Sequence, residues 1–84
     1  MSLNEQFADA QKLAKQISSR PSNQELLDMY SLFKQASDGD VTGKRPGMMD
    51  FKRRAMFDAW AAKKGMATSD AQEKYVELVN RLHR

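Results

Sequence analysis

The chain has 84 residues, a formal net charge of +3, no cysteine and one histidine. By length the chain is expected to be a single domain over residues 1–84. The lack of cysteine excludes disulfides and thiolate metal sites, so no bound metal is expected, and a zinc enzyme is not expected either. No apolar run approaches the roughly 20 residues of a membrane span, and the N-terminal segment lacks the apolar stretch of a secretory signal, so the expected location is cytoplasmic.

The first predicted helix covers residues near 3–17. Ser2 and Glu5 have the spacing of a capping box, in which each side chain accepts the backbone N–H of the other residue. The apolar residues that follow recur in steps of three and four, as on one face of a helix: Leu3, Phe7, Ala10, Ala14 and Ile17. The helix should end before Pro21, because the residue that precedes a proline disfavours the α conformation.

The second predicted helix covers residues near 22–37. Ser22 and Glu25 form another capping box, and Gly39 is a good residue to end the helix because glycine reaches positive φ at little cost. Its apolar residues form one stripe that we expect to face the core: Leu26, Met29, Tyr30 and Phe33. The next segment, 38–49, contains three glycines and a proline without a period, so we expect a long and functional loop.

Two more helices are predicted, near 50–64 and near 68–83. Asp50 is the expected N-cap of the third helix and Gly65 its terminator, while Ser69 with Gln72 is a weaker capping box at the start of the fourth. The apolar residues of these two helices are Phe51, Ala55, Met56, Ala59, Trp60 and Ala62 in the third, and Ala71, Tyr75, Leu78, Val79 and Leu82 in the fourth. No segment alternates as a strand does, so the predicted fold class is all-α with four helices.

Positive charge is concentrated in one segment. Residues 40–64 hold seven basic and three acidic side chains, whereas residues 1–39 hold four and five and residues 65–84 hold three and three. A partner with negative charge at one patch is therefore expected, not a uniformly basic surface.

A binding constellation accompanies this charge. On the second predicted helix Tyr30 and Lys34 lie one turn apart, with Leu27 on the same face, and could offer a hydroxyl and an ammonium to one anion. On the third, Lys52, Arg53 and Met56 share a face, and Tyr75 on the fourth could add a phenol. The alternative is that both tyrosines are core residues and that the basic run is a solvated helix face.

Catalysis is not expected. The sequence has no glycine-rich phosphate loop and no cysteine–histidine or serine–histidine arrangement with a plausible base. Asp38 and Asp40 are close together, but acids in a glycine-rich turn are far more often solvated caps than a general acid and base. The protein is therefore expected not to be an enzyme.

The stretches "YSLFKQASDGD", "RPGMMDFKRRAMFDAW", "KKG" and "AQEKY" resemble the acyl-CoA-binding protein family, also called the diazepam-binding inhibitor family. The similarity runs almost end to end. It implies a four-helix up-down-down-up bundle that binds long-chain fatty acyl-CoA esters without a cofactor. The domain would shield the acyl chain from water, buffer the ester and transport it within the cell between acyl-CoA-using enzymes, as a monomer.

The resemblance also implies which residues contact the ligand: Lys15, Tyr30, Ser31, Leu32, Phe33, Lys34, Lys52, Met56 and Tyr75. Tyr30 and Lys34 would hold the 3′-phosphate and adenine end of coenzyme A. The chain departs from the family at Met56, where a phosphate-binding lysine is usual, and at Phe57, where a tryptophan is usual. Arg53, one turn before Met56, could compensate for the missing lysine.

A third departure is Ala67 in place of a serine cap, which suggests that the last helix begins a turn late. Two other readings remain open. The basic segment with its aromatic residues could bind nucleic acid, although the small net charge argues against it. A plain helical interaction domain with a degenerate acyl-CoA pocket is the second. Stable membrane insertion is not expected, but transient contact with a bilayer during ligand delivery is compatible with the sequence.

Overall fold

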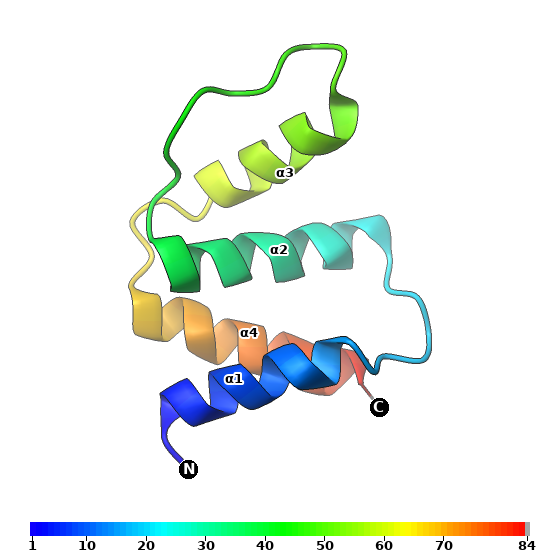
Figure 1. The fold of residues 1–84 in the computed structure, drawn as a ribbon, viewed down its shortest axis with the longest axis vertical. Coiled ribbons are helices and arrows are strands. Elements are labelled where there is room, and N and C mark those ends of the chain that lie inside the picture. Colours follow the sequence, from blue (N-terminus) through cyan, green and yellow to red (C-terminus); the bar gives the residue numbers. More distant parts are fainter. Residues whose placement is uncertain (84) are drawn as a thin grey trace.

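Four helices make up the part of the chain that the computed structural model describes, residues 1–83. They are α1 (Leu3–Ala14), α2 (Asn23–Asp38), α3 (Phe51–Ala61) and α4 (Thr68–Leu82), and this part of the chain contains no strand. Helices α1 and α4 run in one direction and α2 and α3 run in the other (Figure 1). The all-α prediction and the up-down-down-up order of the helices are therefore confirmed.

Three helix starts follow the predicted caps. The N–H of Glu5 donates to Ser2 Oγ at 3.2 Å and the N–H of Ser2 donates to Glu5 Oε1 at 3.3 Å. Ser22 and Glu25 repeat this arrangement at 3.1 and 2.8 Å. The Asp50 side chain accepts a backbone N–H from the first turn of α3 at 3.3 Å. Each cap satisfies N–H groups that have no partner within the helix, which fixes where the helix begins.

Two predicted helix ends are wrong by three residues. Helix α1 ends at Ala14 rather than near residue 17, because the N–H of Gln16 donates to the carbonyl three residues earlier at 2.8 Å, so Ile17 lies beyond the helix. Helix α3 ends at Ala61 rather than near residue 64, and the N–H of Lys64 makes the same kind of bond at 3.1 Å. Tight turns of this type replace the last predicted turn of both helices.

The start of α4 differs from the predicted capping box. The helix begins at Thr68 with Ala67 as its N-cap, and no side chain caps it. Ser69 therefore lies inside the first turn, and the expectation that the helix begins a turn late is wrong. The side chain of Gln72 serves a different purpose, because its amide donates to Asn4 Oδ1 at 2.9 Å and ties α4 to α1.

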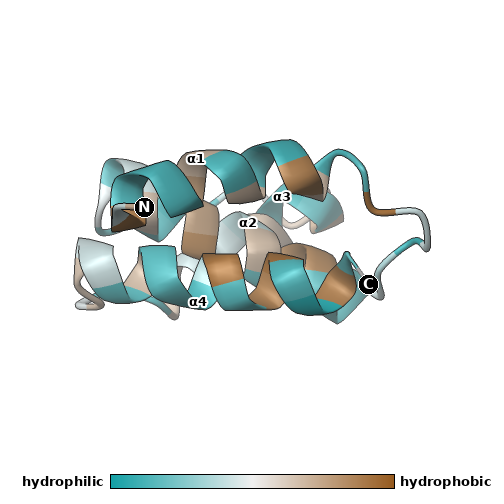
Figure 2. Ribbon diagram, turned by 90° about the horizontal axis from the view of Figure 1, so that it is seen from below, coloured by the Kyte–Doolittle hydropathy of each residue, from teal (hydrophilic) through white to brown (hydrophobic). Residues whose placement is uncertain are grey.

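The core lies between α1, α2 and α4. Helix α4 packs against both α1 and α2, whereas α3 packs against α2. The buried cluster draws on the first two helices and the last: Phe7, Ala10, Leu32, Ala36, Ala71, Tyr75, Leu78 and Val79. Hydrophobic segments alternate with hydrophilic ones along α1 and α4, as expected for helices with one buried face (Figure 2). Helix α3 is thus an outer element, held by α2 and by its loops.

The buried face of α2 is rotated from the predicted stripe. Ser31 and Gln35 are fully buried beside Leu32 and Ala36, whereas Leu26 is exposed. The Ser31 hydroxyl donates to the Asp28 carbonyl at 3.1 Å, and the Gln35 side-chain nitrogen donates to a carboxylate and a carbonyl, whereas Gln35 Oε1 has no hydrogen-bond partner among residues 1–83. The predicted stripe is consequently left half-buried along the edge of the core.

Helix α3 buries few of its apolar residues. Trp60 is buried, and its indole N–H donates to the Gly39 carbonyl at 2.8 Å. Phe51, in contrast, is 76% exposed at the start of the helix. Among the helices α3 packs only on α2, which leaves Phe51 on an open side of the helix.

Candidate ligand-binding surface

Three hollows meet at Tyr30, on the half-buried side of α2. The loop-side hollow, about 420 Å³, is lined by Tyr30, Lys44, Pro46, Arg53, Met56, Phe57 and Trp60. The α1-side hollow, about 480 Å³, is lined by Gln11, Ala14, Lys15, Met29, Tyr30, Phe33 and Tyr75. The α2–α3 hollow, about 580 Å³, is lined by Arg20, Asn23, Leu26, Leu27, Tyr30, Lys52, Ala55 and Met56. Each hollow combines apolar side chains with at least one cation.

The α1-side hollow places Lys15 with two aromatic residues. Tyr75 is buried, and its ring packs edge-on against Phe7 with centroids 5.2 Å apart and planes at 77°. Phe33 lies 6.2 Å from the same ring, centroid to centroid. Burial raises the pKa of the Tyr75 hydroxyl, so this group stays a neutral hydrogen-bond donor at physiological pH.

The α2–α3 hollow has the largest volume of the three and an apolar floor. It lies between the first half of α2, which contributes Leu26 and Leu27, and the first half of α3, which contributes Ala55 and Met56. Lys52 also lines it, with Arg20 from the connection before α2. An apolar groove with cations beside it suits a ligand that has one apolar and one anionic part.

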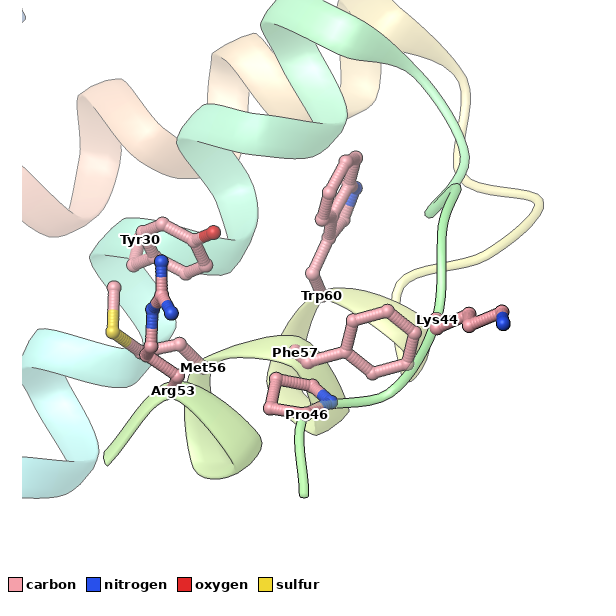
Figure 3. Close-up of a pocket in the computed structure, with 7 residues that line it drawn as sticks. All are labelled: Tyr30, Lys44, Pro46, Arg53, Met56, Phe57 and Trp60. Atoms are coloured by element: carbon pink, nitrogen blue, oxygen red, sulfur yellow. The ribbon is translucent and has the colours of Figure 1, made fainter. Parts of the chain in front are cut away.

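The loop-side hollow contains Met56, the position at which the resemblance implies a lysine. Figure 3 shows Arg53 and Met56 extending from α3 toward Tyr30, with Lys44 on the loop beyond Phe57. The Arg53 side chain is 78% exposed, and its Nη1 lies 3.6 Å from Asp50 Oδ2. This long contact leaves most of the guanidinium in water, where it can turn toward an anion in the hollow.

Lys34 stands beside the loop-side hollow. Its ammonium is bonded to the Asp38 carboxylate one turn later on α2, and it lies 4.8 Å from the centroid of the Trp60 ring. The hydrogen bond to Asp38 raises the pKa of Lys34, so the ammonium stays charged. A phosphate that approached Trp60 would therefore meet a fixed cation whose present partner, Asp38, is itself about half exposed.

Most of the predicted site residues gather around Tyr30. Lys15, Phe33 and Tyr75 share one hollow with it, and Lys52 and Met56 share another. Arg53 joins Met56 in the third. Ser31 and Leu32, also predicted, are buried behind this surface and are not among the residues that line the three hollows.

Two cations at these hollows were not singled out from the sequence. Lys44 belongs to the basic segment, but its position depends on how the loop folds back. The guanidinium of Arg45 fixes that loop to α3 with two bonds to the Asp58 carboxylate, 2.8 and 2.7 Å long. Arg20 precedes a proline in the α1–α2 connection, and no motif marks it.

A second anchor holds the loop to the end of α2. Asp40 Oδ1 accepts the Gln35 amide at 2.9 Å and the Gly65 N–H at 2.8 Å. These bonds lower the pKa of the Asp40 carboxyl, and the bond from Gly65 has the larger effect. Asp40 is therefore a structural carboxylate, and no group of three or more potential metal ligands occurs among residues 1–83.

The burial of Trp60 bears on nucleic-acid binding. The residue is only 8% exposed, so its ring cannot offer a face on which a base could stack. Across the same described residues, no helix has the length and apolar character to cross a membrane.

Known proteins resemble this chain over nearly its whole length. A family model described as "Acyl CoA binding protein" matches residues 4–79. "Acyl-CoA-binding protein homolog 1" of Caenorhabditis elegans is 50% identical, over 90% of this chain and 88% of its own length. "Acyl-CoA-binding protein" of Brassica napus is 43% identical, over 98% and 89%. The crystal structure of Oryza sativa acyl-CoA-binding protein 2 has a TM-score of 0.92 at 38% identity, over 95% of this chain and 87% of its own.

Proposed function

This chain belongs to the acyl-CoA-binding protein family, and from that membership we propose that it binds long-chain fatty acyl-CoA esters, buffers them and carries them without chemical conversion. No cofactor takes part. The acyl-CoA is the ligand, and acyl-CoA-using enzymes would supply and receive it.

The meeting of three hollows at Tyr30 is the structural observation that supports this proposal. An acyl-CoA has a long apolar tail, an anionic pyrophosphate and a nucleotide with a further phosphate. Three neighbouring hollows that share Tyr30, with apolar residues of α2 and α3 and a cation in each, suit all these portions together. Tyr30, which lines all three hollows, would contact both halves of the ligand.

The proposed contacts divide by the chemistry of the ligand. Lys34, beside the indole of Trp60, would neutralise a phosphate of the nucleotide end, and Lys15 and Lys52 would meet the remaining anionic groups. Tyr75 offers a neutral hydroxyl from the core, and Phe33 packs beside it. Ser31 and Leu32, which are buried behind the surface, would act by holding the α2 backbone in place.

Arg53 is proposed to replace the lysine that is usual at the Met56 position. Both residues line the loop-side hollow, and the Arg53 guanidinium is mostly exposed and only loosely paired. Lys44 lines the opposite part of this hollow and could share the same phosphate. A guanidinium can bind a phosphate with two parallel hydrogen bonds, which would compensate for the longer distance that the Arg53 side chain has to span to reach the phosphate.

Calorimetric titration with a series of saturated acyl-CoA esters tests the proposed function. Each buried methylene contributes about 0.8 kcal/mol, so two extra carbons should tighten binding about 15-fold while the hollow has room. Free coenzyme A and palmitate are the controls, and each should bind far more weakly than palmitoyl-CoA. If the protein binds neither palmitoyl-CoA, free coenzyme A nor palmitate, or if it binds all the esters equally, its pocket is degenerate.

The same titration tests Arg53 directly. Arg53→Ala should weaken palmitoyl-CoA binding, as should Lys34→Ala, because each removes a cation from the loop-side region. Lys74→Ala is the matched control, since Lys74 is an exposed cation of α4 that lines none of the three hollows. If Arg53→Ala binds like the control while Lys34→Ala binds weakly, Arg53 is a surface charge only.

Residues 1–84 are proposed to act as one binding domain in the cytoplasm. The family model spans four packed helices, which supports a single unit, and the absence of cysteine suits a reducing compartment. We expect a monomer, which sedimentation equilibrium measures directly. Hydrolysis of palmitoyl-CoA by the purified protein would contradict the proposal that the ligand is released unchanged.

A further inference from the structure

Three large apolar side chains project into water at the start of α3. Met48, Met49 and Phe51 are 75%, 89% and 76% exposed. They fall within four consecutive residues, and we refer to these four, Met48 to Phe51, as the apolar tip. Isolated exposed apolar residues are common on protein surfaces, but three neighbours with this exposure form a patch that needs an explanation.

The fold presents the apolar tip in a defined way. The N–H of Asp50 donates to the carbonyl of Gly47 at 3.1 Å, so Met48 and Met49 occupy the two corners of a tight turn. The loop before the turn is anchored to α3 by the bidentate pair of Arg45 and Asp58. The methionines therefore point outward because the backbone is held, and not because the segment is unstructured.

Cations surround the apolar tip. Lys52 and Arg53 follow it directly and are exposed, and Lys44 precedes it on the loop. The segment 40–64 as a whole carries seven basic and three acidic side chains. The first turns of α2 and α3 lie at the same end of the molecule as the tip (Figure 1), and this end includes Arg20, which lines the α2–α3 hollow together with Lys52.

We propose that the apolar tip docks this end of the molecule on an anionic lipid bilayer. The three side chains would enter the boundary between headgroups and acyl chains, while the flanking cations contact lipid phosphates. The patch protrudes as a turn and comprises three side chains, far fewer than the 20–30 residues a side of a standard protein interface. Flexible methionine side chains also adapt to a fluid surface without a fixed complementary shape.

Docking in this orientation would bring the α2–α3 hollow, which Lys52 lines, close to the lipid surface. The relevance of this proximity to ligand delivery rests on the proposed function. The docking itself does not rest on the proposed function, because the apolar tip lies outside the three hollows. The two proposals can therefore be tested separately.

Co-sedimentation with sucrose-loaded vesicles, in the absence of acyl-CoA, tests the docking. An equal mixture of phosphatidylcholine and phosphatidylserine should bind the protein, and phosphatidylcholine alone should bind it much less. Met49→Ser and Phe51→Ser should each weaken binding about tenfold, the effect of withdrawing one large apolar side chain from lipid. Lys52→Gln should weaken it roughly fivefold, and added salt should weaken it further.

Two controls accompany these variants. Met49→Leu keeps an apolar side chain and should bind vesicles like the parent protein, and Lys74→Gln removes an exposed cation from α4, which does not contact α3. Calorimetry with palmitoyl-CoA in vesicle-free buffer should give unchanged affinity for Met49→Ser, which separates docking from ligand binding.

The proposal is overturned if Met49→Ser and Phe51→Ser bind vesicles as the parent does, or if vesicles with and without phosphatidylserine bind equally. It is also overturned if sedimentation equilibrium shows a dimer of the parent protein that Phe51→Ser dissociates, because a second copy would then cover the apolar tip.

Discussion

Met56→Lys should strengthen ligand binding and weaken the ligand-free fold. Met56 lines both the loop-side and the α2–α3 hollows, so an ammonium there would reach an anion bound in either. One added charge-assisted hydrogen bond contributes roughly 1.5–3 kcal/mol, or about tenfold to about 150-fold in affinity for palmitoyl-CoA. Without ligand, the new cation would lie one turn from Lys52 and Arg53, and two such like-charge pairs cost about 0.4–1 kcal/mol in unfolding free energy.

Calorimetry and urea unfolding measure the two effects, with Met56→Gln as a neutral polar control. If Arg53 compensates in the parent protein, Arg53→Ala should weaken binding more in the parent than in the Met56→Lys background, because the new lysine would then take over the contact. Equal affinities for Met56→Lys and Met56→Gln would refute the reasoning, since the position would then not face an anion.

Three further predictions concern the fold. Ala67→Ser should supply the missing cap of α4 and raise the urea unfolding free energy by about 0.5–2 kcal/mol. Asp40→Asn should lower the free energy of unfolding at neutral pH, and it should make that free energy fall less steeply as the pH becomes acidic. The bond from Gly65 lowers the pKa of Asp40, so the carboxylate contributes stability above its pKa in the unfolded chain, and this contribution is lost as the pH falls through its pKa in the folded protein. Urea unfolding at neutral and at acidic pH measures this. Arg45→Gln should remove the pair with Asp58 and speed amide hydrogen exchange across residues 41–49, while amides in α4 keep their protection.

Local chemistry explains which helix boundaries could be predicted. Ser2, Ser22 and Asp50 each cap the helix they were expected to cap, because a cap is a bond between a side chain and a backbone group three residues away. Helix ends are less local in origin. At Ala14 and Ala61 the last turns tighten to bonds over three residues, a choice that no single residue in the sequence indicates.

The orientation of α2 could not be predicted from hydropathy. A hydrophobic stripe through Leu26 and Phe33 outweighs Ser31 and Gln35 on any hydropathy scale, yet the latter two are buried. Their burial depends on partners from other parts of the chain, since Gln35 bonds to the carbonyl of Met66, 31 residues away. The same rotation leaves Tyr30 half-buried, and this is why it can line three hollows rather than fill the core.

The candidate site was predictable where it lies on helices and not where it depends on loops. Tyr30, Lys52 and Met56 follow from helical spacing together with the family resemblance, and the structure brings them to one hollow. Lys44 is placed by a loop whose course depends on a pair of charges 13 residues apart. Such pairs of exposed residues have no sequence signature, so this contribution to the loop-side hollow was missed.

The packing of α1 on α4 constrains how the protein is made. The Asn4 side chain meets that of Gln72, 68 residues later, and Phe7 packs against the ring of Tyr75. During synthesis the first helix therefore leaves the ribosome long before the partner it needs. We expect the nascent chain to stay unfolded until α4 emerges, so a ribosome stalled within the α3 codons should hold a chain that proteases cleave readily.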